Sequence, residues 1–106
     1  GWFSLVGAQA VAAVREYYLD RVFIGVNAVD AERGLTCHHP EEAAVNRALV
    51  AQARERIVVA DRSKLGQVVR CLICPTEEVH VLVTDRDAAD ADVAPFVEHG
   101  VDVRRV

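Results

Sequence analysis

Small and polar residues follow three of the apolar runs in this chain. Gly25 and Asn27 close the run at 21–26, and Asp85 follows the run at 79–84. The densest group, Asp61, Ser63 and Lys64, comes directly after the run at 56–60. If these runs are parallel strands, their carboxyl ends meet at one edge of the sheet, where such sheets bind ligands.

The residue types in these groups suit a polyol that carries a phosphate. Lys64 offers a point charge for the phosphate, and Ser63 can bond a phosphate oxygen. The oxygens of Asn27, Asp61 and Asp85 can accept hydrogen bonds from sugar hydroxyls. The alternative stays open, because Asp and Ser after a strand are also common turn formers with a purely structural role.

An alternation of helices and strands must position these groups. We predict three helices, from Ser4 to about residue 17, from Pro40 to about residue 54 and from Asp92 to about residue 99. Ser4 is the predicted N-cap of the first helix, and Pro95 falls in the first turn of the last. We predict strands at 21–26, 56–60, 67–73, 79–84 and, as an edge strand, 101–106. The continuous apolar centre of the first strand indicates burial on both faces. Residues 27–39 are predicted to form a long loop. The pattern predicts a single α/β domain over residues 1–106, with a mainly parallel sheet flanked by helices.

Composition excludes several classes of function. The chain has 106 residues, a formal net charge of −4 and no cluster of Lys and Arg, so nothing in it resembles a nucleic-acid-binding surface. No apolar run reaches the roughly 18 residues of a membrane helix. Three cysteines are too few and odd in number for a disulfide framework, which favours a cytoplasmic location.

The cysteines raise the separate hypothesis of a zinc or redox module. Cys71 and Cys74 form a C-x-x-C pair, and Cys37, His38 or His39 could complete a zinc site. The pair spans the end of a predicted strand, which is the wrong geometry for a redox motif at a helix N-terminus. We therefore expect small apolar Cys side chains in and near a sheet, with no metal and no cofactor.

Five motifs in register resemble the C-terminal sensor domain of DeoR-family transcriptional repressors. They are residues 23–25 (Phe-Ile-Gly), 32–36 (Glu-Arg-Gly-Leu-Thr), 40–43 (Pro-Glu-Glu-Ala), 59–66 (Val-Ala-Asp-Arg-Ser-Lys-Leu-Gly) and 83–85 (Val-Thr-Asp). The resemblance implies a fold similar to that of ribose-5-phosphate isomerase. It also implies a phosphorylated sugar effector that alters DNA binding by a separate helix-turn-helix domain. It assigns Gly34 and Thr36 to a loop that faces the ligand, and Asp61, Ser63 and Lys64 to the turn at the pocket.

The chain departs from the family pattern in several places. The family's sensor domain begins with a strand and a Gly/Thr-rich phosphate loop, which precede the region present here, so we expect the N-terminal portion of the domain to be missing. Asn46 stands where many members have Lys or Arg, and His38 and His39 replace a more usual Pro and Asp. A sheet that lacks strands exposes an edge, which predicts a homodimer or larger assembly. The alternative function is a sugar-phosphate isomerase-like enzyme, in which Lys64 would stabilise an enediolate.

Overall fold

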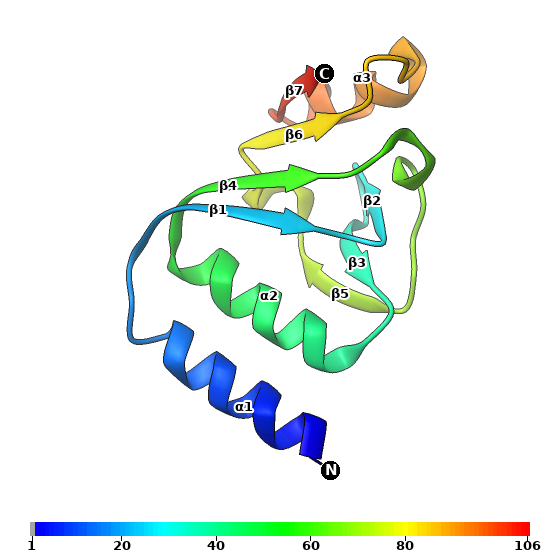
Figure 1. Cartoon of the computed structure of the whole chain (residues 1–106). Coiled ribbons are helices and arrows are strands. Elements are labelled where there is room, and N and C mark those ends of the chain that lie inside the picture. The colour runs from blue at the N-terminus through cyan, green and yellow to red at the C-terminus, as the bar shows by residue number, and fades with distance from the viewer. Residues whose placement is uncertain (1) are drawn as a thin grey trace.

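A computed structural model describes the backbone of residues 2–106 and the side chains from Gly7 onward. Its elements, in chain order, are α1 (Trp2–Val14), β1 (Leu19–Gly25), β2 (Ala28–Asp30), β3 (Gly34–Cys37), α2 (Pro40–Gln52), β4 (Ala53–Val59), the 3₁₀ turn η1 (Arg62–Lys64), β5 (Cys71–Cys74), the 3₁₀ turn η2 (Thr76–Glu78), β6 (Val81–Thr84), α3 (Asp90–Glu98) and β7 (Asp102–Arg105) (Figure 1). The predicted α/β fold with a mainly parallel sheet flanked by helices is confirmed. None of the described helices could cross a membrane.

The main sheet has four parallel strands in the order β1-β4-β6-β7. Each successive strand of this sheet in the sequence is added on the same side of the one before it. Connections between parallel strands are right-handed, so the crossovers through α2 and α3 lie on the same face. Figure 1 shows α2 beside β1 and β4 and α3 beside β6 and β7, with α1 packed against α2 as a further layer. β7 lies at one edge, as predicted for the last strand.

Within the described residues, the helix-covered face of this sheet is the more deeply buried one, and the other face is buried only at its centre, where Ile57 and Val81 are each 8% exposed. On β1, Ile24 is 2% exposed, whereas Phe23, which points to the other face, is 66% exposed. On β4, Val58 is fully buried, whereas Val59 is 47% exposed. The prediction that the first strand is buried on both faces is therefore wrong for this chain. A continuous apolar run in a strand shows that the strand has apolar side chains on both faces. It does not show which element covers the second face.

A small antiparallel sheet, β2-β3-β5, packs beside α2. It corrects two predictions. Residues 27–39 are not one long loop, because β2 and β3 pair as a hairpin around the turn at 31–33. The strand predicted at 67–73 begins only at Cys71 and joins this sheet rather than the parallel one. The hairpin turn is stabilised by Asp30, whose carboxylate accepts hydrogen bonds from the backbone N–H groups of Glu32 and Arg33.

The helix boundaries also differ from prediction in three places. α1 begins at Trp2, so Ser4 lies inside the helix instead of capping it. α2 ends at Gln52 because β4 already begins at Ala53. α3 begins at Asp90 rather than after Asp92, which places Pro95 inside the helix and not in its first turn. Its acidic first turn, with Asp90 and Asp92, favours this earlier start because it faces the positive end of the helix dipole.

Candidate functional site

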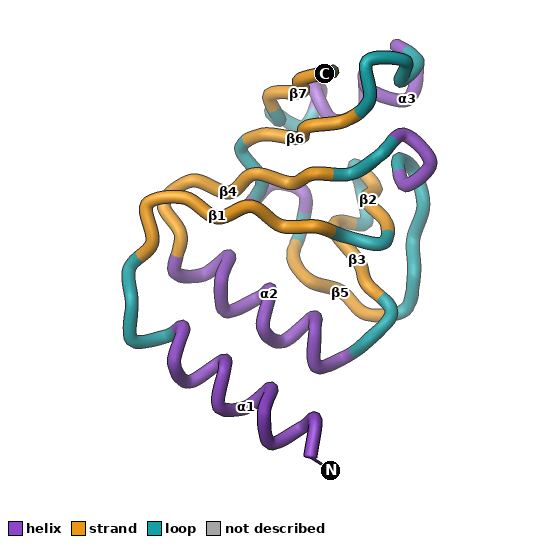
Figure 2. The backbone as a smooth tube through the Cα atoms, viewed as in Figure 1, coloured by secondary structure: helices purple, strands orange, loops and turns teal. Residues whose placement is uncertain are grey.

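The predicted convergence of polar groups at one edge of the sheet is present. Gly25 of β1 is in register with Val59 of β4, and Val59 is in register with Val83 of β6. The residues that follow these strands therefore leave the sheet side by side. Figure 2 shows their loops on the same side of the molecule, with η1 among them. A Cβ added at Gly25 would meet no atom within 4 Å, so open space lies at this edge.

Asp61 organises the turn after β4. It is the N-cap of η1, and its Oδ1 accepts hydrogen bonds from both the backbone N–H and the hydroxyl of Ser63. Its other oxygen lies 3.5 Å from Nζ of Lys64. The hydrogen bonds from the Ser63 side chain and backbone lower the pKa of the Asp61 carboxyl below its ordinary value. Asp61 is therefore an anion at neutral pH that holds a hydroxyl and an ammonium close to itself.

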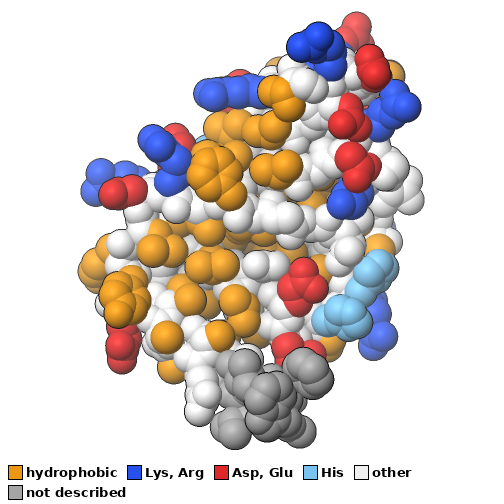
Figure 3. Space-filling model, in the orientation of Figure 1, with side chains coloured by type: hydrophobic (Ala, Val, Ile, Leu, Met, Phe, Trp, Pro, Cys, Tyr) orange, Lys and Arg blue, Asp and Glu red, His pale blue; other side chains and the backbone are white. Residues whose placement is uncertain are grey.

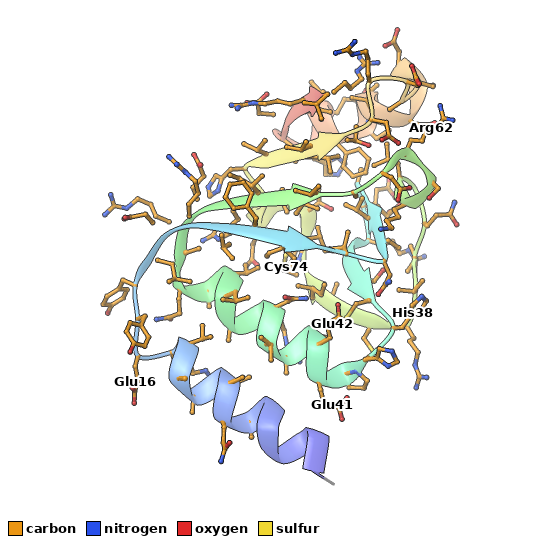
Figure 4. The ribbon with its side chains drawn as sticks, viewed as in Figure 1. Glu16, His38, Glu41, Glu42, Arg62 and Cys74 are labelled. Atoms are coloured by element: carbon orange, nitrogen blue, oxygen red, sulfur yellow. The ribbon has the colours of Figure 1, made fainter. Side chains whose placement is uncertain are left out.

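Asp85 ties the end of β6 to the same turn. Its Oδ2 accepts a hydrogen bond of 2.9 Å from the backbone N–H of Arg62, the first residue of η1. Sequence reasoning placed Asp85 at this edge but missed Arg62, whose side chain is exposed there and labelled in Figure 4. Its position directly after Asp61 was the available signal. Two carboxylates, a hydroxyl, Lys64 and Arg62 thus lie on one connected turn.

The remaining predicted residues have structural partners of their own. Oδ1 of Asn27 accepts a hydrogen bond from the backbone N–H of His38 at 3.1 Å. Thr36 is 3% exposed, and its hydroxyl accepts from the backbone N–H of Val69 at 3.0 Å. Gly34 begins β3 with φ of 94° and packs against the carbonyl of Cys74. The resemblance assigned Gly34 and Thr36 to a ligand-facing loop, but both lie in a buried strand, and ligand contact by either stays a prediction.

A hollow of about 350 Å³ lies between α2 and β5, away from the carboxyl edge of the parallel sheet. Its two cations are already engaged: Arg47 donates to the carbonyl of Leu72, and Arg56 donates to the carbonyls of Val50 and Glu78. These bonds fasten α2, β4 and η2 to one another. We therefore assign this hollow a structural role and place the candidate site at the carboxyl edge of the parallel sheet.

No metal centre is evident from the side chains described. Among them, no group of three or more His, Cys, Asp and Glu side chains could hold a metal ion. Two of the histidines are used in the fold. Nδ1 of His80 accepts from the backbone N–H of Arg56, and Nδ1 of His99 lies 2.8 Å from the carbonyl of Pro95 at the end of α3.

Comparison with known proteins decides the family. A sequence model of the DeoR C terminal sensor domain matches residues 2–86. The chain belongs to the DeoR family. The putative aga operon transcriptional repressor of Escherichia coli O157:H7 is 32% identical over 100 residues, which are 94% of this chain and 37% of that protein. The HTH-type transcriptional regulator GlpR of Haloferax volcanii is 35% identical over 95 residues, 90% of this chain and 37% of that protein.

A further relative shows how little of each full-length protein is matched. The HTH-type transcriptional repressor GlcR of Bacillus subtilis is 34% identical over 82 residues, 77% of this chain and 31% of that protein. The chain thus spans about a third of the length of these curated relatives. DeoR sensor domains belong to transcription regulators and not to enzymes, so the isomerase alternative is set aside.

Proposed function

We propose that this DeoR sensor domain binds a phosphorylated sugar at the carboxyl edge of its parallel sheet. We further propose that binding alters the DNA affinity of a separate helix-turn-helix domain. We place the protein in the cytoplasm. The observation that carries the proposal is the turn after β4. There, Asp61 holds Ser63 and Lys64, and Asp85 fastens the turn to the neighbouring strand.

The chemistry of this turn suits both parts of such a ligand. Nζ of Lys64 lies 3.5 Å from a carboxylate oxygen of Asp61, and its side chain is about one-third exposed, so it can turn to a phosphate. Asp61 and Asp85 accept hydrogen bonds, as sugar hydroxyls require. No atom lies within 4 Å of a Cβ added at Gly25, so a ligand can approach the backbone there.

Removal of Lys64 tests the phosphate contact. The experiment uses the full-length gene product and the sugar phosphate that the wild-type protein binds. We expect Lys64→Ala to lower the affinity for this ligand by roughly 10- to 100-fold, because a hydrogen bond to a charged group is lost. Isothermal titration calorimetry with a panel of sugar phosphates and the matching unphosphorylated sugars measures the affinity. The variant should retain its weak affinity for the unphosphorylated sugar.

Arg54→Ala is the matched control for this experiment. Arg54 carries the same charge as Lys64 and lies on β4, the strand that leads into the turn. It is at the amino end of β4, next to Asp20 and Arg21, and so at the opposite end of the strand from the turn. It should therefore leave the affinity unchanged. Equal losses in the two variants would indicate a general electrostatic effect, and binding of no sugar phosphate by the wild-type protein would refute the proposed effector.

We also propose that the protein acts as a homodimer or larger assembly through the free edge of β1. Among the described strands, β1 pairs on one side only, with β4. An unpaired edge with an exposed Phe23 is a template for a second copy. Multi-angle light scattering should give at least twice the monomer mass, and Phe23→Lys should shift the protein toward the monomer. A wild-type protein that is monomeric at high concentration would contradict the proposal.

A further inference from the structure

Two of the three cysteines face each other across the antiparallel strands β3 and β5. Cys37 is the register partner of Cys71. Residues directly opposite on antiparallel strands have Cα atoms about 4.5–5.5 Å apart, which lies within the roughly 4.4–6.8 Å range of disulfides. The backbone therefore already provides the spacing that a disulfide between these two residues requires.

The two thiols also converge on the same short segment after β3. Sγ of Cys37 donates to the carbonyl of His39 at 3.4 Å, and Sγ of Cys71 donates to the carbonyl of His38 at 3.7 Å. Because these acceptors are adjacent in the chain, both sulfurs lie at the same end of the strand pair. Both are free thiols in this structure.

Cys74 does not belong to this pair. Its register partner is Leu35, and a register shift separates that pair from the Cys37–Cys71 pair, so Cys74 lies three residues along β5 from Cys71 and is not opposite Cys37. Its thiol is buried. Burial raises the pKa of the Cys74 thiol to about 12. Figure 4 shows Cys74 inside the molecule, between the sheet and α2, and away from His38. The C-x-x-C spacing of Cys71 and Cys74 is therefore misleading, and the neighbour of Cys71 comes from β3.

We propose that Cys37 and Cys71 form a reversible thiol–disulfide site that responds to low-molecular-weight disulfides such as oxidised glutathione. The partly exposed Cys71 thiolate attacks one sulfur of the oxidant, forming a mixed disulfide and releasing one glutathione thiolate. The Cys37 thiolate then attacks the sulfur of Cys71 and releases the second. The two protein thiols lose two protons and two electrons, and the oxidant is reduced to two glutathione molecules.

The order of these steps follows from exposure. Cys37 is fully buried, and burial raises its pKa, so it is a poor first nucleophile. Once Cys71 carries the mixed disulfide, however, Cys37 is already opposite its sulfur. The product closes a loop that contains α2, β4 and η1. We expect the melting temperature of the oxidised protein to lie roughly 10 °C above that of the reduced protein, because the crosslink restricts the unfolded chain.

Peptide mapping tests the linkage. The protein is equilibrated with oxidised glutathione, its remaining thiols are alkylated, and it is cleaved with trypsin, which releases residues 34–47 and 71–86. In Cys74→Ala, these two peptides should appear as one disulfide-linked species that reduction separates. Tandem mass spectra of the wild-type protein give the same assignment without any variant, with Cys74 alkylated.

Cys37→Ala separates the two steps. It should accumulate the mixed disulfide of Cys71 with glutathione, and its melting temperature should show no rise on oxidation. The proposal is overturned if all three cysteines of the wild-type protein are still free to be alkylated at every ratio of oxidised to reduced glutathione. It is also overturned if Cys71 is linked to Cys74, or if Cys71 stops at the mixed disulfide while Cys37 stays free.

Discussion

Gly34→Ala is expected to destabilise the protein by roughly 3 kcal/mol, lowering its melting temperature by roughly 10–20 °C. Two physical causes add. Gly34 has φ of 94°, which L-residues with a side chain rarely adopt. In addition, a Cβ at this position would lie 2.5 Å from the carbonyl oxygen of Cys74, a backbone atom that cannot rotate away. Thermal unfolding monitored by circular dichroism measures the loss.

Gly66→Ala is the control that separates these causes. Gly66 has φ of 78°, but no atom lies within 4 Å of its added Cβ. It should therefore cost only the backbone strain, about 1 kcal/mol. The prediction fails if the two variants are equally stable. An unchanged melting temperature of Gly34→Ala, together with a loss of effector binding, would instead support the ligand-facing role that the family resemblance gives this glycine.

The sequence was sufficient to predict the parallel sheet, because its strands are defined by local patterns. The apolar runs that became β1, β4 and β6 are each bounded by polar turn residues. Their carboxyl ends had to meet once the strands were parallel, so the grouping of Asp61, Lys64 and Asp85 near one edge followed from the fold class. That part of the candidate site was therefore within reach of sequence reasoning.

The small sheet was not predictable in the same way, because its strands have little signal of their own. β2 has three residues and β3 has four, too few to show an alternation. Their formation depends on distant partners, such as Thr76, whose hydroxyl donates to the carbonyl of Asp30. The structural roles of Asn27 and Thr36, and the approach of Cys37 to Cys71, depend on this sheet and were missed with it.

The uncovered sheet face shows a second limit of sequence patterns. Figure 3 shows hydrophobic side chains over the strands of the sheet and over the helices below them, with most Lys, Arg, Asp and Glu side chains toward the outline of the molecule. Arg21 and Glu55 pair at one end of this face, and Asp102 and Arg104 pair on its β7 side. An apolar residue such as Phe23 is suited to burial, but the sequence of one chain does not say which element supplies it. Identical residues on the two faces should therefore differ greatly in their effect on stability.

Phe96→Ala tests this difference in the buried core. Phe96 is 2% exposed and is the largest of the fully buried side chains described, joining α3 to the core below the sheet. We expect its truncation to reduce the free energy of unfolding by about 3–5 kcal/mol, through lost burial and the cavity left behind. Urea unfolding followed by circular dichroism measures it.

Phe23→Ala makes the same chemical change on the uncovered face, where the ring is 66% exposed. In the isolated 106-residue chain, at concentrations too low for two copies to associate, it should cost about 1 kcal/mol or less, because most of the ring of the monomer is in water. A cost as large as that of Phe96→Ala would show that Phe23 is buried in solution, by a second copy or by another part of the protein. Repeating the unfolding over a range of protein concentrations distinguishes these, since only burial by a second copy makes the cost depend on concentration.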